Sequence, residues 1–217
     1  MHPVIILSGK AQSGKTSAMN HILSIEPNGE KVIFAEPLKE MCVNILGLKH
    51  HQCYGSNAQK EEFTHIQWKD IPIDESVKSQ IIKSDPNFLT GREVLEVFGT
   101  QIFRRTYHNC WVSAAVNRIK GFGYRSDHIV KLSVIEDCRF PNEIDYLSEH
   151  LDNVHVIRLT RNPLNRQVES EMALDNYDFN KPNIHVIDNH NMNMQEKNEA
   201  VGRIVADILL FNGRGNA

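Results

Sequence analysis

GKAQSGKT, residues 9–16, follows the apolar run VIIL at 4–7 and precedes the helix-like run SAMNHILSI at 17–25. Its pattern is G-x-x-x-x-G-K-[ST]. Glycines let successive backbone N–H groups curl toward phosphate oxygens, and the positive end of the following helix dipole adds to the attraction. The stretch therefore predicts a phosphate-binding loop between a strand and a helix, against the alternative of a Gly-Ser-Lys turn that binds nothing.

The motif assigns roles within this loop. Lys15 is expected to reach the β- and γ-phosphates of a nucleotide, and Thr16 is expected to ligate Mg²⁺. The residues expected to hold ATP along the loop are Gly9, Lys10, Ala11, Gln12, Ser13, Gly14, Lys15, Thr16 and Ser17.

Composition excludes several classes of protein. The chain has 217 residues, with 24 basic and 27 acidic side chains, so no net positive field draws it to nucleic acid or to a membrane surface. Its four cysteines form no C-x-x-C pair, which favours reduced thiols over a disulfide framework. No apolar run approaches the roughly 18 residues that a membrane span needs. We therefore expect a soluble intracellular protein.

Hydrophobic periodicity predicts alternating strands and helices. Strands are predicted at 4–7, 31–35, 128–137, 154–160 and 185–188. Helices are predicted at 15–25, 37–48, 92–106, 111–120, 142–150, 161–174 and 195–211. The polar stretch 49–90 is interpreted as an irregular insertion over the sheet edge. This order predicts an α/β, doubly wound P-loop NTPase fold, with a five-stranded parallel sheet flanked by helices in a single domain.

A phosphate-binding loop alone fits ATPases, GTPases, kinases and passive switches, so other polar residues must decide among them. The N-K-x-D motif of guanine-specific GTPases does not occur. Asp137 ends the apolar run SVIED, as expected of a carboxylate that orients the Mg²⁺ shell, although an aspartate there could also cap the next turn. Arg139 follows at the carboxyl edge of the sheet, where this class of fold binds ligands.

Two further groups of arginines carry positive charge. Gln101, Arg104 and Arg105 have spacings of three and four in GREVLEVFGTQIFRR, and Arg92 stands near the start of that helix, so we expect them to converge on an acceptor phosphate. A solvated helix face is the alternative.

Residues 158–167, RLTRNPLNRQ, supply the second group of arginines. Arg161 and Arg166 are expected in a mobile lid, in residues 161–184, that closes over ATP. Surface ion pairs with Glu169 and Glu171 are the alternative for that pair. Arg158 lies inside a strand pattern and is interpreted as structural.

Other polar and aromatic residues give weaker signals. His50, His51, Cys53 and His65 match no familiar zinc spacing, so solvent or packing is favoured over a metal site. Trp68, Tyr107 and Trp111 could stack on a base, but core packing is favoured.

With these residues in place, the chain resembles the bacteriophage deoxynucleoside monophosphate kinases, a family of P-loop kinases that make deoxynucleoside diphosphates. The resemblance extends from near the start to about Asn189 and is weakest in residues 49–90 and in the closing helix. The segments that carry it are GKAQSGKT, FAEPLKEM, TGREVLEVFGTQIFRR followed by W, VIEDCRFPNEID, VIRLTRN, ESEMALDNYDF and VIDN.

The resemblance implies a kinase of the cytoplasm, that of an infected host cell if the gene is a phage gene, with ATP and Mg²⁺ as cofactors and a homodimer as its assembly. It implies that Asp137 serves the metal shell beside Thr16, and that Asp188 and Asn189 lie where adenine binds. The catalytic set that it implies is Lys15, Asp137, Arg139, Arg161 and Arg166. The segment 49–110 is expected to form the acceptor-side insertion and helix. The residues expected to bind the acceptor are Glu36, Lys39, Arg92, Gln101, Arg104, Arg105, Trp111, Arg139, Asn142 and Glu143. Gln101 departs from the family pattern, since an acidic residue is expected after Thr100.

The reaction that we expect is direct in-line transfer of the γ-phosphate of ATP to the acceptor phosphate. A phosphate oxygen is already a nucleophile at neutral pH, so positioning and charge stabilisation suffice. Two alternatives remain open: a related P-loop kinase that acts on phosphomevalonate or dephospho-coenzyme A, and a nucleotide-binding module without phosphate transfer. A nucleic-acid-binding role has no basic or aromatic platform to support it.

Overall fold

The computed structural model describes residues 2–82, 85–122, 129–164 and 172–214, and the chain forms two compact units. We call Met1–Phe34 together with Val112–Ala217 the sheet unit, and Ala35–Trp111 the inserted unit. The inserted unit begins before residue 49, where the sequence predicted an insertion to start. Each unit has its own hydrophobic core.

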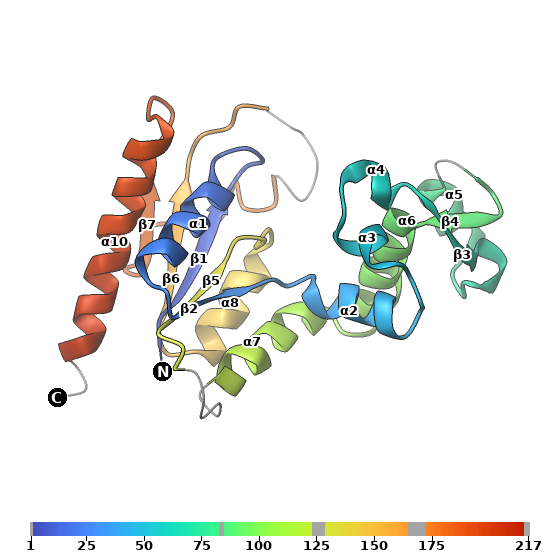
Figure 1. Ribbon diagram of the computed structural model, residues 1–217, viewed down its shortest axis with the longest axis horizontal. Coiled ribbons are helices and arrows are strands. Elements are labelled where there is room, and N and C mark those ends of the chain that lie inside the picture. The colour runs from blue at the N-terminus through green and yellow to red at the C-terminus, as the bar shows by residue number, and fades with distance from the viewer. Residues whose placement is uncertain (1, 83–84, 123–128, 165–171, 215–217) are drawn as a thin grey trace. The chain divides into compact units, whose positions relative to one another are not determined.

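A five-stranded, all-parallel sheet frames the sheet unit, as predicted (Figure 1). The strand order is β2-β5-β1-β6-β7. The strands are β1 (Val4–Gly9), β2 (Gly29–Val32), β5 (Leu132–Ile135), β6 (Val154–Leu159) and β7 (Ile184–Ile187). β1 is central and its apolar residues are fully buried, as expected of a parallel strand that is covered on both faces.

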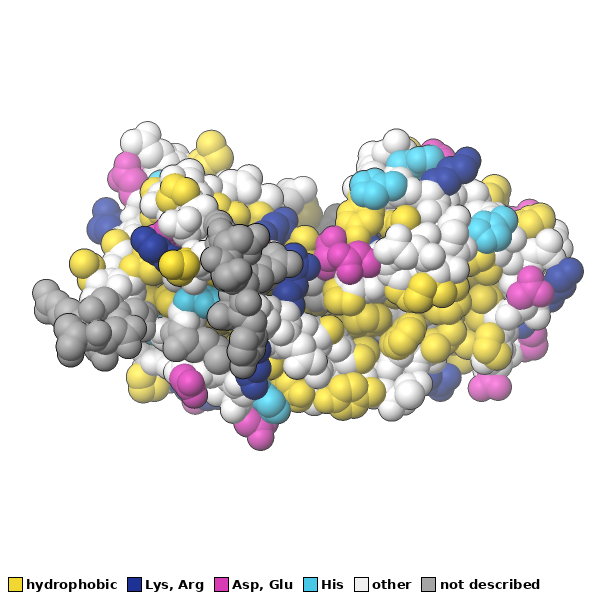
Figure 2. Space-filling view, turned by 60° about the horizontal axis from the view of Figure 1, so that its bottom comes forward, with side chains coloured by type: hydrophobic (Ala, Val, Ile, Leu, Met, Phe, Trp, Pro, Cys, Tyr) yellow, Lys and Arg dark blue, Asp and Glu magenta, His cyan; other side chains and the backbone are white. Residues whose placement is uncertain are grey.

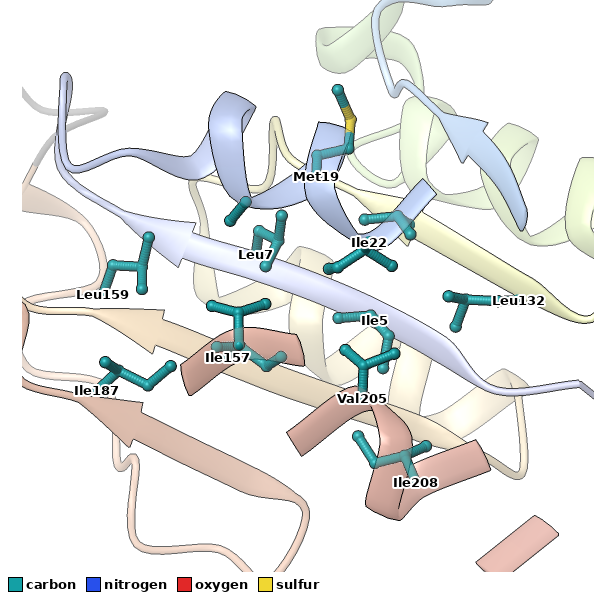
Figure 3. Packing of buried hydrophobic residues seen from close by; sticks show 13 residues of the cluster. Ile5, Leu7, Met19, Ile22, Leu132, Ile157, Leu159, Ile187, Val205 and Ile208 are labelled. Carbon is teal, nitrogen blue, oxygen red and sulfur yellow. The ribbon is translucent and has the colours of Figure 1, made fainter. Parts of the chain in front are cut away.

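Helices pack on this sheet through apolar stripes. The helices of the sheet unit are α1 (Lys15–Ile25), α8 (Pro141–His150), α10 (Met194–Arg214) and, from Val112 on, α7 (Cys110–Phe122). Figure 3 shows Met19 and Ile22 of α1 and Val205 and Ile208 of α10 meeting apolar side chains of the sheet. Since Ile5 and Leu7 belong to this cluster, the alternate residues of β1 face the opposite side of the sheet.

The strand order creates a topological switch at β1. After β1 the chain builds β2 and β5 on one side, and it then crosses to build β6 and β7 on the other side. Ligands of open parallel sheets bind beyond the carboxyl ends of the strands at such a switch. The loop GKAQSGKT leaves β1 at this point.

The inserted unit has regular structure, so the expectation of an irregular stretch at 49–90 was wrong. Its elements are α2 (Glu36–Asn44), α3 (His50–Tyr54), α4 (Asn57–Lys60), β3 (Phe63–Gln67), the 3₁₀ turn η1 (Trp68–Asp70), α5 (Glu75–Ile81), β4 (Phe88–Thr90), α6 (Gly91–Glu96) and the π-helix η2 (Val97–Arg104). β3 and β4 form an antiparallel pair. These elements bury Trp68, Leu89 and Val94 in one apolar cluster.

Hydrophobic side chains also reach the surface of the inserted unit (Figure 2). The large ones that are exposed there are Ile45, Phe63, Phe88, Phe103 and Tyr107. Scattered exposed apolar residues are normal in globular proteins, so they carry no functional argument alone.

Several element boundaries differ from the prediction. β2 covers 29–32 rather than 31–35, because the backbone N–H of Phe34 donates to Asp137 rather than to a strand. β5 covers 132–135 rather than 128–137. The predicted helix 161–174 is not helical at 161–164, and residues 165–171 lie outside the described part of the chain. The predicted helix 92–106 changes from α to π geometry at Val97.

Candidate functional site

In the glycine-rich loop between β1 and α1, the backbone at the glycine positions leaves little room for a side chain. Gly9 has φ 156° and Gly14 has φ 101°, and Gln12 at the loop tip also has a positive φ, of 60°. A Cβ on Gly9 would lie 2.9 Å from the carbonyl oxygen of Leu159 and 2.5 Å from Ser13 Oγ. The loop conformation therefore depends on glycine at these positions.

The side chain of Lys15 folds back over this loop. Its Nζ donates to the carbonyl oxygens of Gly9 at 2.7 Å and Lys10 at 2.8 Å. Ser13 is 1% exposed, and its Oγ has no hydrogen-bond partner among the described residues. The ammonium group is thus held at the loop by neutral carbonyl oxygens, which an anionic phosphate oxygen could replace.

A buried lysine from α10 fixes the start of α1. Lys197 is 4% exposed, and its Nζ donates to the carbonyl oxygen of Gly14 at 2.8 Å and also to Ser17 Oγ. Burial lowers the pKa of Lys197. Ser17, predicted to contact ATP, donates to the same Gly14 carbonyl at 3.0 Å. Thr16 is exposed at the first turn of α1.

Asn189 ties the loop to the end of β7. Its Nδ2 donates to the carbonyl oxygen of Ser13 at 2.9 Å, and its Oδ1 accepts the backbone N–H of Arg161 at 2.9 Å. The Asn189 side chain is 2% exposed, so these contacts are buried. The neighbouring Asp188 is exposed and pairs with His190, whose hydrogen bonds lower the pKa of Asp188.

A small cleft lies beside the loop within the sheet unit. It is lined by Gly9, Lys15, Glu136, Cys138, Arg139, Arg158 and Leu174. Arg158 stands opposite Ser8 in the register of β1 and β6 and donates to Ser8 Oγ at 2.9 Å. Two predicted site residues, Lys15 and Arg139, therefore share this cleft with Arg158, which the sequence had placed among structural residues.

Two neighbouring carboxylates follow β5. Both oxygens of Asp137 accept the backbone N–H of Phe34, at 3.0 and 3.2 Å, while Glu136 lines the cleft and pairs with Lys31 at 2.7 Å. Burial, and then the charges of Glu143 and Asp137, raise the pKa of the thiol of Cys138 well above its usual value. A neutral thiol thus separates these carboxylates from Arg139 in the chain.

The segment after Asp137 caps α8. The Oε2 of Glu143 accepts the backbone N–H groups of Arg139 at 2.7 Å and Phe140 at 3.1 Å, and Glu143 is 3% exposed. This acid, predicted to touch the acceptor, therefore acts on the backbone at the helix start. It leaves the Arg139 side chain exposed, while Asn142 in the first turn is half-buried.

Of the two predicted lid arginines, only Arg161 lies among the described residues. Arg161 is exposed, and its backbone N–H is the group that binds Asn189. Arg166 lies outside the described residues.

In the inserted unit, the segment that carries the predicted arginine cluster is not a regular α-helix. Gln101 and Arg104 belong to η2, where i→i+5 hydrogen bonds widen each turn, so residues three apart diverge more than in an α-helix. Arg104 is half-buried, while Arg105 is exposed. Arg92 pairs with Glu61 and also donates to Asn57 Oδ1 at 3.1 Å.

The remaining acceptor-side candidates have partners inside the inserted unit. Tyr54 donates to Glu36 Oε1 at 3.0 Å, and Lys39 Nζ lies 5.0 Å from the centroid of the Tyr54 ring. Burial and the bond to Glu36 raise the pKa of Tyr54. Trp111 Nε1 donates to the carbonyl oxygen of Gly99 at 3.1 Å, which fixes its indole against η2.

Sequence reasoning missed three charged residues near the loop: Glu136, Asp175 and Lys197. Lys197 had a signal, since it falls on the α10 stripe with Val201, Val205 and Ile208 and must therefore face the core. No signal in the sequence indicated that Asp175 pairs with Lys10, because the two residues are far apart in the chain.

No protein-family model matches the sequence, and no curated protein matches it. In the described ranges, no group of three or more His, Cys, Asp or Glu side chains could hold a metal ion. Among the helices that the structure describes, none is both long and apolar enough to cross a membrane.

Proposed function

We propose that the chain is a P-loop kinase that transfers the γ-phosphate of ATP to a deoxynucleoside monophosphate. The observation that carries the proposal is the placement of the glycine-rich loop at the switch point of a parallel sheet, with Lys15, Arg139 and Arg158 around one cleft beside it. Three cations and a glycine-rich backbone suit a chain of phosphates.

The loop residues would act by positioning and by electrostatics. Lys15 would exchange its carbonyl partners for the β- and γ-phosphates, and backbone N–H groups of the loop and the start of α1 would donate to the same oxygens. Arg139 would stabilise the charge that spreads over the transferred group. The acceptor oxygen attacks directly, so no covalent intermediate with the protein is needed.

The chain has oxygen ligands that fit Mg²⁺. At nucleotide sites this ion takes most of its ligands from phosphates and water and only one or two from the protein, so a preformed acidic cluster is not required. Thr16 and Asp137 would hold it, and Glu136 is a further carboxylate at the cleft. When bound, the ion neutralises charge on the β- and γ-phosphates.

The choice of acceptor rests on the resemblance of the sequence to the phage kinases. Within the sheet unit, we assign acceptor recognition to Arg139, which lines the cleft together with Arg158. Clustered guanidinium groups suit an acceptor that is itself a phosphate.

A coupled assay of ADP formation tests the proposal. The acceptors are dGMP, dTMP, dCMP, dAMP and their ribose counterparts, with ATP and Mg²⁺, and the variants are Lys15→Ala and the matched control Lys131→Ala, an exposed lysine before β5. We expect ADP formation that requires a monophosphate, survives Lys131→Ala and falls at least ~100-fold in Lys15→Ala.

If the protein phosphorylated only phosphomevalonate or dephospho-coenzyme A, the proposed acceptor would be wrong and that molecule would take its place. ATP binding without transfer to any acceptor would indicate a nucleotide-binding module and would contradict the proposal.

A further inference from the structure

A turn from the segment before β7 packs against the glycine-rich loop. Leu174 is 4% exposed and lines the cleft that Gly9 and Lys15 also line. The next residue, Asp175, forms an ion pair with Lys10 of the loop through its Oδ1, and the same oxygen lies 3.9 Å from the guanidinium of Arg158. One carboxylate thus meets two cations at the edge of the cleft.

Both cations are shielded from water, and Arg158 is also held in place by neighbouring side chains. The side chains of Lys10 and Arg158 are each only 13% exposed, so solvent screens their charges less than it screens surface charges. Arg158 also donates to Ser8, and its guanidinium lies 4.9 Å from the centroid of the Phe179 ring. The Asp175 side chain is more open, at 42% exposure, so it can leave without disrupting the core.

We propose that the Asp175 carboxylate is an internal competitor for the phosphate chain of the nucleotide. It offsets part of the positive charge of Lys10 and Arg158 in the nucleotide-free protein, and a bound phosphate oxygen takes its place. The proposal rests on the proposed function, since it assumes that the cleft beside the loop receives phosphate. A carboxylate and a phosphate oxygen are both anionic acceptors, so each can satisfy an ammonium and a guanidinium group in turn.

The competition has a consequence for selectivity. A ligand must supply enough negative charge to offset the loss of the Asp175 ion pairs, and a triphosphate supplies more than a monophosphate does. Asp175 therefore disfavours ligands with short phosphate chains at the ATP position. If Asp175 only braced the loop, its removal would weaken the binding of ATP instead.

Calorimetric titration separates these two roles. The probe is ATP with Mg²⁺, and the variants are Asp175→Asn and Asp178→Asn. The second is a matched control, with the same change of charge in the same segment, and Asp178 Oδ1 accepts the backbone N–H of Asn180. We expect Asp175→Asn to tighten ATP binding by about fivefold, in line with the loss of its close ion pair with Lys10, and Asp178→Asn to leave it unchanged.

The same substitution, made in the Lys10→Met variant, tests whether the effect is local. In Lys10→Met the competing pair is already broken on one side, so Asp175→Asn should tighten ATP binding by less than about twofold there. Equal gains in both backgrounds would indicate a general effect of net charge and would overturn the proposal. Unchanged or weaker ATP binding in Asp175→Asn, with the circular dichroism spectrum retained, would overturn it as well.

The same proteins distinguish this inference from the kinase proposal. Tighter ATP binding in Asp175→Asn, without phosphate transfer by any variant, supports the inference and contradicts the kinase. Acceptor-dependent transfer without tighter ATP binding in Asp175→Asn supports the kinase and contradicts the inference. Failure of the unaltered protein to bind ATP would overturn both.

Discussion

Gly9 occupies a position where a side chain has no room. The nearest obstacle to a Cβ that cannot rotate away is the backbone carbonyl oxygen of Leu159, at 2.9 Å. Since β1 pairs with β6 at Leu159, relief of this clash would have to move a central strand.

We therefore expect Gly9→Ala to lower the free energy of unfolding by about 1–3 kcal/mol, as overpacking does elsewhere, and to weaken ATP binding. Gly121→Ala is the matched control, because a Cβ at Gly121 meets no atom within 4 Å and alanine favours a helix. Urea unfolding of both variants measures the difference. Equal stability of the two proteins would show that the loop is not constrained at Gly9.

Asn189 gives a second test, because its two proposed roles predict different results. As a tether between Ser13 and Arg161 it pairs two backbone groups, and Asn189→Ala would leave both without these bonds. We expect a loss of about 1–3 kcal/mol in the free energy of unfolding, measured without nucleotide. A variant of unchanged stability that only raises the KM for ATP would instead assign Asn189 to the base.

Among the elements, α6 begins with a short sequence motif that stabilises the start of the helix. TGRE, residues 90–93, forms a capping box: the backbone N–H and Oγ1 of Thr90 donate to Glu93 Oε2, at 2.8 and 3.0 Å, and the N–H of Glu93 donates to Thr90 Oγ1 at 3.2 Å. Both residues are buried, so water cannot replace these bonds.

Thr90→Ala should therefore lower the free energy of unfolding by about 1–2 kcal/mol. Ser56→Ala provides the comparison, since Ser56 caps the four-residue helix α4 in the same way but is exposed. We expect a smaller loss there, because water can bond the freed N–H group. A loss at Ser56 as large as that at Thr90 would contradict the role given to burial.

The elements also show what the sequence could predict. The parallel sheet was predictable because runs such as VIIL at 4–7 are apolar on both faces and alternate with amphipathic helices. The π geometry of η2 was not, because its apolar spacings of three and four residues are those of an α-helix. The elements at 49–90 are short and are stabilised by contacts distant in sequence, such as Thr64 Oγ1 with the carbonyl oxygen of Leu89, at 2.8 Å.

In the candidate site, too, some features could be predicted from the sequence and others could not. The loop residues 9–16 could be located from a local pattern, and the structure places that loop at the sheet switch. The pairing of Asp175 with Lys10 and the contact of Arg158 with Ser8 depend on strand register and chain crossing, which no local pattern contains. Glu143 illustrates a further limit, because a motif glutamate can serve a substrate or a helix start equally well.

The stability of the whole chain should depend on pH through two half-buried histidines. His155 in β6 and His185 in β7 have ring centroids 5.9 Å apart. Burial lowers the pKa of both, the charge of His185 lowers that of His155 further, and Asp207 opposes the shift in His185. Below the ordinary histidine pKa of 6.5 the unfolded chain binds more protons than the folded chain.

This contribution to stability is therefore complete above pH 6.5 and is lost as the pH falls through that value toward the lowered pKa. We expect the Tm to fall between about pH 7.5 and about pH 5, and to fall less in the double variant His155→Gln, His185→Gln. His65→Gln, an exposed histidine of the inserted unit, is the control and should keep the full fall. Identical pH profiles of Tm for all three proteins would contradict the assignment.

The account as a whole depends on phosphate transfer by the loop at the sheet switch. The most direct measurement follows the label from ATP labelled at the γ-phosphate, with dGMP, dTMP, dCMP or dAMP as acceptor. We predict that the label appears in a deoxynucleoside diphosphate with the unaltered protein and with Lys131→Ala, and that Lys15→Ala abolishes its appearance. Label recovered only as inorganic phosphate, or remaining entirely in ATP with every acceptor, would contradict the account.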